Sequence, residues 1–187
     1  MKWYKEKLAQ LLVKSKSVLK GDFVLKSGLK TDIYIDCRQL FLNSQYLSTI
    51  IPMYIDEIRE ILDSDTVLCG IPTSGLVLMG GLLQRCAIHR DVRGIYLRPE
   101  TKDHGTKQNF EGDVRTTDKI ILLDDVVTSG STIIKAISQL TERNLKVTDI
   151  IVLLDRSDSF KDLMKNSNIN YLSLLTMEEL CKLTNMS

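Results

Sequence analysis

The sequence predicts an α/β fold with a mainly parallel central sheet and helices on both faces. Short, mainly apolar stretches with the length of buried strands occur at residues 66–70, 92–97, 120–123 and 147–154. Segments with apolar residues at helical spacing alternate with them, as parallel sheets require, because each connection must cross back over the sheet. With 187 residues, 43% of them hydrophobic, the chain has the size of one domain with a substantial core.

The first third of the chain predicts a helix followed by two short strands. Apolar residues at helical spacing from Tyr4 to Leu19 favour a helix over residues 3–19, and Gly21 is expected to end it. Residues 22–28 and 32–36 are typical of two strands about a glycine turn. We expect residues 1–40, together with 155–187, to form a small hood over a core of residues 41–154.

The next elements repeat a plan of helix, strand, tight turn and helix. Residues 43–62 predict a helix, although Pro52 leaves open whether it is kinked or split in two. After the strand at 66–70 comes a turn at 71–75 and an apolar helix at 76–85. The turn is compatible with a second anion site that uses Thr73 and Ser74, and equally with a plain strand-to-helix connection.

Residues 98–112 form a long polar stretch with almost no positions expected to be buried. A loop of this length inside a compact domain is usually functional or disordered. Its cationic groups suit a polyanion better than other ligands, with a solvated loop as the alternative reading. These groups are Arg98, Lys102, His104 and Lys107.

The segment 120–132 carries the strongest chemical signal. Four apolar residues are followed by Asp124 and Asp125, and then by a loop rich in Thr, Ser and Gly that leads into a helix. Backbone N–H groups, hydroxyls and the positive end of a helix dipole suit a phosphate. The two carboxylates suit sugar hydroxyls, or a metal held through water. The segment therefore predicts a sugar-phosphate site, the alternative being a strand end followed by an ordinary helix cap.

The last third predicts a strand at 147–154, a short strand at 171–174 and a helix at 176–183 that begins with a capping box at Thr176. Arg156 follows the first of these strands, where the ligand crevice of a parallel sheet lies. It is a candidate fork for a carboxylate or phosphate, or else pairs with Asp155 or Asp158.

Composition excludes several other classes. A net charge of +1 gives no general argument for nucleic acid or an acidic membrane, and no apolar stretch is long enough to span a bilayer. The scattered cysteines have no metal-binding spacing, so we expect reduced, mostly buried thiols of a cytoplasmic protein. They are Cys37, Cys69, Cys86 and Cys181.

The segment 120–132 closely resembles the signature for 5-phosphoribosyl-1-pyrophosphate (PRPP) of type I phosphoribosyltransferases. Together with residues 22–28, 33–36, 98–105 and 154–156, it resembles the orotate phosphoribosyltransferase family in order and spacing. The resemblance implies ribosyl transfer from PRPP to orotate in UMP synthesis, with Mg²⁺ carried by PRPP and without direct protein ligands. It also implies a homodimer in which loop 98–112 reaches the partner's site.

The resemblance also implies roles for individual residues. The implied catalytic residues are Arg98, Lys102, His104, Asp124 and Asp125. The residues implied to bind PRPP are Asp124, Asp125, Val126, Val127, Thr128, Ser129, Gly130, Ser131, Thr132, Arg98, Lys102, His104, Thr73 and Ser74. Those implied to bind orotate are Lys26, Tyr34, Ile35, Thr128 and Arg156.

The sequence departs from the family pattern at two places. Pro99 stands where many members have a second basic residue, and the turn at 72–75 lacks a lysine found in many bacterial forms. That turn is more similar to the form fused to a decarboxylase, a domain we do not expect here. Two rival functions stay open: a phosphoribosyltransferase for a purine or other base, and a regulator that senses PRPP without catalysis.

Overall fold

A computed structural model describes residues 2–24, 28, 30–88, 91–98, 110–157 and 159–186. Its centre is a six-stranded sheet with the strand order β5-β4-β3-β6-β7-β8. Neighbouring strands are parallel except for β5, which runs antiparallel to β4 at one edge. The predicted fold class is thereby confirmed. The strands are β3 (Thr66–Gly70), β4 (Arg93–Leu97), β5 (Phe110–Glu111), β6 (Lys119–Val127), β7 (Lys146–Asp155) and β8 (Asn170–Thr176).

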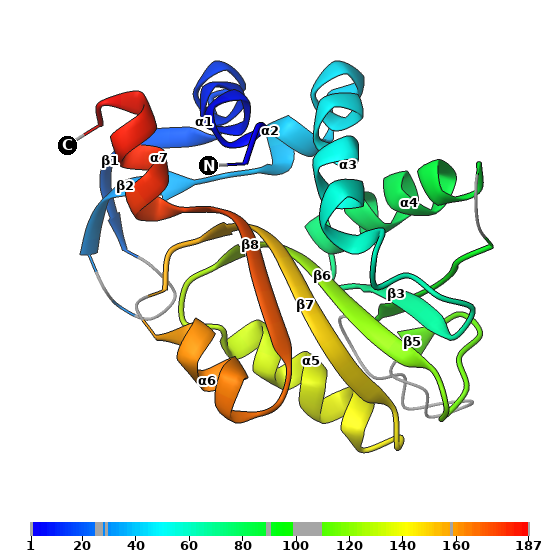
Figure 1. The fold of residues 1–187 in the computed structure, drawn as a ribbon. Coiled ribbons are helices and arrows are strands. Elements are labelled where there is room, and N and C mark those ends of the chain that lie inside the picture. Colours follow the sequence, from blue (N-terminus) through cyan, green and yellow to red (C-terminus); the bar gives the residue numbers. More distant parts are fainter. Residues whose placement is uncertain are drawn as a thin grey trace.

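Helices cover both faces of this sheet, and each face has its own apolar core (Figure 1). On one face lie α3 (Ser44–Ile58) and α4 (Ser74–Cys86), with the short α2 (Arg38–Phe41) beside them. On the other lie α5 (Ser131–Thr141) and α6 (Phe160–Asn166). Pro52 lies inside α3, so the segment forms one helix across the proline. All of β3 is buried, in agreement with its continuous apolar sequence.

A smaller layer sits beyond the carboxyl end of the sheet and holds both chain ends (Figure 1). It contains α1 (Lys5–Lys14), α7 (Met177–Thr184) and an antiparallel pair, β1 (Val18–Val24) and β2 (Lys30–Ile35). Helix α1 packs against α7 and β8. The capping box predicted for the last helix is confirmed at Thr176 and Glu179. Strand β8 lies within the segment expected as hood, yet it extends the main sheet.

Two sequence predictions need correction. The first helix does not reach Leu19: it ends at Lys14, and Lys16 has a φ of 57° that α-helix does not allow. Val18 and Leu19 instead pair with β2, so the first strand begins earlier than residue 22. The polar stretch 98–112 is also not a loop throughout, because Phe110 and Glu111 form strand β5, in which Phe110 is 8% exposed and pairs with Leu97.

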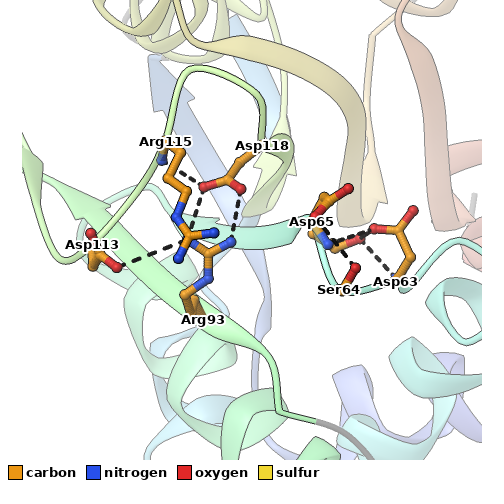
Figure 2. Close-up of polar contacts among 8 residues, drawn as sticks. Asp63, Ser64, Asp65, Arg93, Asp113, Arg115 and Asp118 are labelled. Atoms are coloured by element: carbon orange, nitrogen blue, oxygen red, sulfur yellow. Dashed lines mark hydrogen bonds and ion pairs between the residues drawn. The ribbon is translucent and has the colours of Figure 1, made fainter.

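The amino ends of the central strands are joined by ion pairs (Figure 2). Asp118, with a side chain 1% exposed, accepts hydrogen bonds from both terminal nitrogens of Arg93, at 2.9 and 2.8 Å. It also accepts one from the backbone N–H of Arg115 at 2.6 Å. Asp63 accepts from Thr66 Oγ1 at 2.8 Å and from Lys119 Nζ at 2.6 Å. These contacts link the starts of β3, β4 and β6 to one another.

Candidate active site

The carboxyl ends of the parallel strands place four connections at one edge of the sheet. The connections follow β3, β4, β6 and β7, and ligands of open parallel sheets bind at this edge. Arg98 and Asp124 therefore lie on the same edge, two strand spacings apart, which is about 10 Å. The three loops predicted to follow the strands at 70, 124 and 155 thus lie at this same edge.

Asp124 and Asp125 end the apolar part of β6 as a pair of neighbouring carboxylates. Asp124 is 9% exposed, and its Oδ1 accepts a hydrogen bond from the backbone N–H of Asp125 at 2.9 Å. Burial, followed by the charge of Asp125, raises the pKa of Asp124 to about 8. Among the described residues, neither carboxylate forms an ion pair with a lysine or arginine. The pair is thus prepared for hydroxyl donors or a cation.

The loop after β6 forms a small cavity at the amino end of α5. The cavity has a volume of about 60 Å³ and is lined by Asp124 and by residues 126–133. Gly130 caps α5 with a φ of 73°, and a side chain there would collide with Phe160 of α6. Ser129 Oγ donates to Ser131 Oγ at 3.1 Å, and both side chains are exposed. Backbone N–H groups and hydroxyls thus surround a space that suits a small anion.

The turn at 71–75 is pressed against β6 just ahead of the carboxylates. The backbone N–H of Ile71 donates to the carbonyl of Leu123 at 3.0 Å. A side chain at Gly75 would collide with that same carbonyl, and one at Gly70 would lie 2.7 Å from the carbonyl oxygen of Gly75. Thr73 precedes α4 without capping a backbone N–H through its side chain. The turn that contains Thr73 and Ser74 is therefore anchored to β6 at Leu123, the residue before the acidic pair.

Arg98 follows β4 and forms an ion pair with Glu111 of β5. Its side chain is 21% exposed and that of Glu111 is 40% exposed. Arg98 is therefore available to solvent at the carboxyl edge, but it already has a carboxylate partner.

Arg156 connects the end of β7 to the small antiparallel sheet. Its backbone N–H donates to Val127 at 2.8 Å, and its Nη2 donates to Thr31 Oγ1 of β2 at 3.2 Å. Burial lowers the pKa of Arg156, although an arginine remains charged. Ser157, not Arg156, donates to Asp155, at 2.7 Å from its backbone N–H. The guanidinium thus faces the hood rather than the neighbouring acid.

The β2 residues predicted to bind orotate lie on opposite faces of their strand. Ile35 shares the inward face with Thr31, whereas Tyr34 is 36% exposed and stacks on Phe23 with ring centroids 5.4 Å apart. The structure therefore does not bring the Tyr34 ring to the face that Arg156 contacts.

Three predicted site residues, Lys26, Lys102 and His104, lie outside the described residues, as does Pro99. The described part of the chain contains no group of three or more His, Cys, Asp or Glu side chains that could hold a metal ion. No helix within that part is both long and apolar enough for a membrane span.

Sequence reasoning missed several neighbours of the site. Cys37 is fully buried, and this burial, followed by the charges of Asp125, Asp36 and Asp124, raises the pKa of its thiol. Glu111 lies in the stretch predicted to be a polar loop, and Phe160 belongs to α6, a helix that the sequence pattern does not predict. For the close packing of the turn at 71–75, the sequence does contain a signal. Gly70 and Gly75 lie five residues apart around this turn, a spacing that indicates a close approach of two backbone segments.

Comparison with known proteins agrees with this geometry. The phosphoribosyl transferase domain model matches residues 42–169. The orotate phosphoribosyltransferase of Aeropyrum pernix is 32% identical over 173 residues, which cover 92% of this chain and 90% of that protein. Its crystal structure superposes with a TM-score of 0.79, covering 95% of this chain and 99% of that one at 28% identity. The uridine 5'-monophosphate synthase of Bos taurus is 35% identical over 84% of this chain but only 32% of its own length.

The fold and the site thus define a phosphoribosyltransferase, an enzyme class that transfers a pentosyl group. Within this class, the chain belongs to the orotate phosphoribosyltransferase family.

Proposed function

We propose that this chain transfers ribose 5-phosphate from PRPP to orotate, which gives orotidine 5'-monophosphate and pyrophosphate. The observation that supports this most is the buried Asp124–Asp125 pair directly ahead of the anion-sized cavity at 126–133. A sugar phosphate satisfies both parts at once, with hydroxyls on the carboxylates and its phosphate in the loop.

In this proposal, the ribose part of PRPP is held by β6 and the loop that follows. Backbone N–H groups and the hydroxyls of Thr128, Ser129, Ser131 and Thr132 bind the 5'-phosphate. Asp124 and Asp125 accept hydrogen bonds from the ribose hydroxyls. Because these contacts fix the ribose on both sides, its C1' points out of the loop toward the rest of the carboxyl edge.

The leaving group calls for cations rather than for a nucleophile. As the C1'–O bond breaks, positive charge grows on the ribose and negative charge on pyrophosphate, so positive groups beside the pyrophosphate lower the barrier. Arg98 and Lys102 would supply them, His104 would also donate a proton, and Thr73 and Ser74 would add hydrogen bonds. Lys102 and His104 enter only through the family resemblance.

Mg²⁺ would accompany PRPP and neutralise its pyrophosphate. The carboxylates of Asp124 and Asp125 fit such an ion, because Mg²⁺ prefers oxygen ligands. A nearby cation would also lower the raised pKa of Asp124. The two aspartates would face the metal through water.

The acceptor would bind between the end of β7 and the hood. Arg156 lies half-buried at this place and suits the orotate carboxylate. Lys26 and the strand at Tyr34–Ile35 would bind the rest of the ring, with Tyr34 acting through its backbone because its side chain points away. We further propose the division into a hood (1–40 and 155–187) and a core (41–154), with β8 of the second hood segment extending the core sheet. A homodimer with loop 98–112 acting across the interface and a cytoplasmic location are also part of the proposal.

One assay tests the proposal. Purified protein with PRPP and Mg²⁺ is supplied in parallel with orotate, hypoxanthine, adenine or uracil, and release of pyrophosphate is followed. We expect turnover with orotate alone. If another base is turned over and orotate is not, the result favours a phosphoribosyltransferase for a purine or other base. If PRPP binds but no base is turned over, the result favours the regulator.

A further inference from the structure

We infer that Glu111 is the resident counter-ion of Arg98 and competes with the pyrophosphate group for it. The inference rests on the proposed function in one respect, namely that Arg98 binds pyrophosphate. It adds a residue that neither the sequence motifs nor the proposed roles include.

The pairing of β4 with β5 brings the two side chains together. Tyr96 lies opposite Glu111 in this antiparallel pair, so Arg98 is the diagonal neighbour of Glu111 on the same face. Diagonal neighbours are about 7–8 Å apart at their Cα atoms, a separation that a long arginine side chain can close. The observed ion pair is therefore a consequence of the register.

Glu111 is held firmly by the residues on both sides. Phe110 is buried in the core on one face of the sheet, opposite Leu97. Gly112 has a φ of 114°, and a side chain there would lie 2.5 Å from the carbonyl oxygen of Gly94. Because its neighbours are fixed to β4, the Glu111 backbone cannot withdraw when an anion approaches Arg98.

The ion pair between Arg98 and Glu111 is weak enough for an anionic ligand to replace the carboxylate. Both side chains are partly exposed, at 21% for Arg98 and 40% for Glu111, and partly exposed pairs are weak. Pyrophosphate, with its higher charge, would displace the carboxylate, but at the cost of breaking the pair and of leaving Glu111 close to an anion. Glu111 would thus weaken binding of pyrophosphate and favour its release as a product.

The test measures binding of inorganic pyrophosphate with Mg²⁺ at low ionic strength by titration calorimetry, without orotate. Glu111→Gln should tighten binding about 2- to 5-fold, the range that corresponds to a partly exposed ion pair. In an Arg98→Ala background the same substitution should have a clearly smaller effect, because only the repulsion between Glu111 and the anion is then relieved. Asp113→Asn is the matched control, since Asp113 is an exposed acid of the same segment, 4.0 Å from Arg93 at the other end of β4.

A second measurement needs no ligand. The rate at which phenylglyoxal modifies Arg98, followed by mass spectrometry, should rise in Glu111→Gln, whereas Arg93 should react at its wild-type rate because its partner Asp118 is retained. An unchanged rate at Arg98 would overturn the pairing.

The binding results separate the possible failures. If Glu111→Gln binds pyrophosphate equally or more weakly, or gains as much without Arg98, the competition is refuted while the proposed function stands. If the wild-type protein binds no pyrophosphate at all, both the competition and the proposed function fail.

Discussion

The two ends of the central sheet use the same residue type in opposite ways. At the amino end, Asp118 is buried but receives three hydrogen bonds, and the bond from Arg93 holds the pKa of its carboxyl below the usual range. At the carboxyl end, Asp124 is buried beside another acid, which together with burial raises its pKa to about 8. Asp118 is neutralised by the protein, whereas Asp124 has no lysine or arginine partner in the part of the chain that the structure describes.

This difference separates residues that stabilise the fold from residues that await a ligand. A buried carboxylate costs free energy unless charged or polar partners compensate for the lost water. At the amino end that compensation comes from Arg93 and Arg115 within the protein (Figure 2). At the carboxyl end no lysine or arginine of the described residues supplies it, and a carboxyl with such a raised pKa is typical of functional sites.

The largest effect is expected for Asp124→Asn. The substitution removes an acceptor for the ribose hydroxyls at the reacting sugar, so turnover should fall by at least about 100-fold in the orotate assay. Stability should change in the opposite direction, because the variant no longer buries an acid beside Asp125, and the melting temperature should rise at pH 7.5.

The pH dependence gives this prediction a sign. The pKa of Asp124 is raised from 3.8 to about 8 on folding, so the native state binds the proton more tightly than the unfolded state. The wild-type protein should therefore lose stability as pH rises from about 4 to 8, and this contribution should be missing in Asp124→Asn. Equal melting temperatures of the two proteins across this range would contradict the raised pKa.

The mirror-image substitution, Asp118→Asn, should damage the fold and spare the site. It leaves Arg93 without its buried carboxylate partner, and the expected loss is about 1–3 kcal/mol, below the cost for a fully buried pair because Arg93 is 24% exposed. At about 2–4 °C per kcal/mol for this chain length, the melting temperature should fall visibly.

Two controls sharpen this second prediction. The pKa of Asp118 is lowered on folding, so the difference from wild type should be full at neutral pH and shrink as pH falls below the ordinary carboxyl range. Turnover per folded molecule should stay at the wild-type level at 25 °C. A loss of turnover as large as that of Asp124→Asn would show that the two ends are not independent.

Local sequence was sufficient to predict the acidic pair and the loop at the carboxyl end of the sheet, but not the ion pair at the amino end. Residues 124–132 are contiguous, so the carboxylates and the phosphate-sized loop could be recognised together. The apolar run 66–70 predicted a strand that is indeed fully buried. Asp118 and Arg93 are 25 residues apart, and nothing in either neighbourhood indicates that they meet.

The remaining misses have the same physical origin. Val18 and Leu19 continue the helical spacing of α1, but pairing with β2 overrides that local pattern. Strand β5 has two residues, too few to show any periodicity, and exists only because β4 lies beside it. The contact of Gly75 with Leu123 also depends on tertiary packing. Long-range pairing therefore accounts for what the sequence did not reveal.

The smallest effect is expected at the exposed rim of the amino end, for Lys119→Met. Lys119 is 53% exposed and its partner Asp63 is 43% exposed, so solvent screens the pair despite the 2.6 Å separation. The bond to Lys119 is the main reason that the pKa of Asp63 falls to about 2, but Asp63 keeps its hydrogen bond from Thr66 in the variant.

The melting temperature of Lys119→Met should therefore drop by about 1 °C at most at low salt. At 1 M salt the drop should disappear, because the Debye length is then about 3 Å. Thermal unfolding at the two salt concentrations measures both values. A drop as large as that of Asp118→Asn would mean that the exposed charges at the amino end stabilise the fold as much as the buried Asp118 pair does.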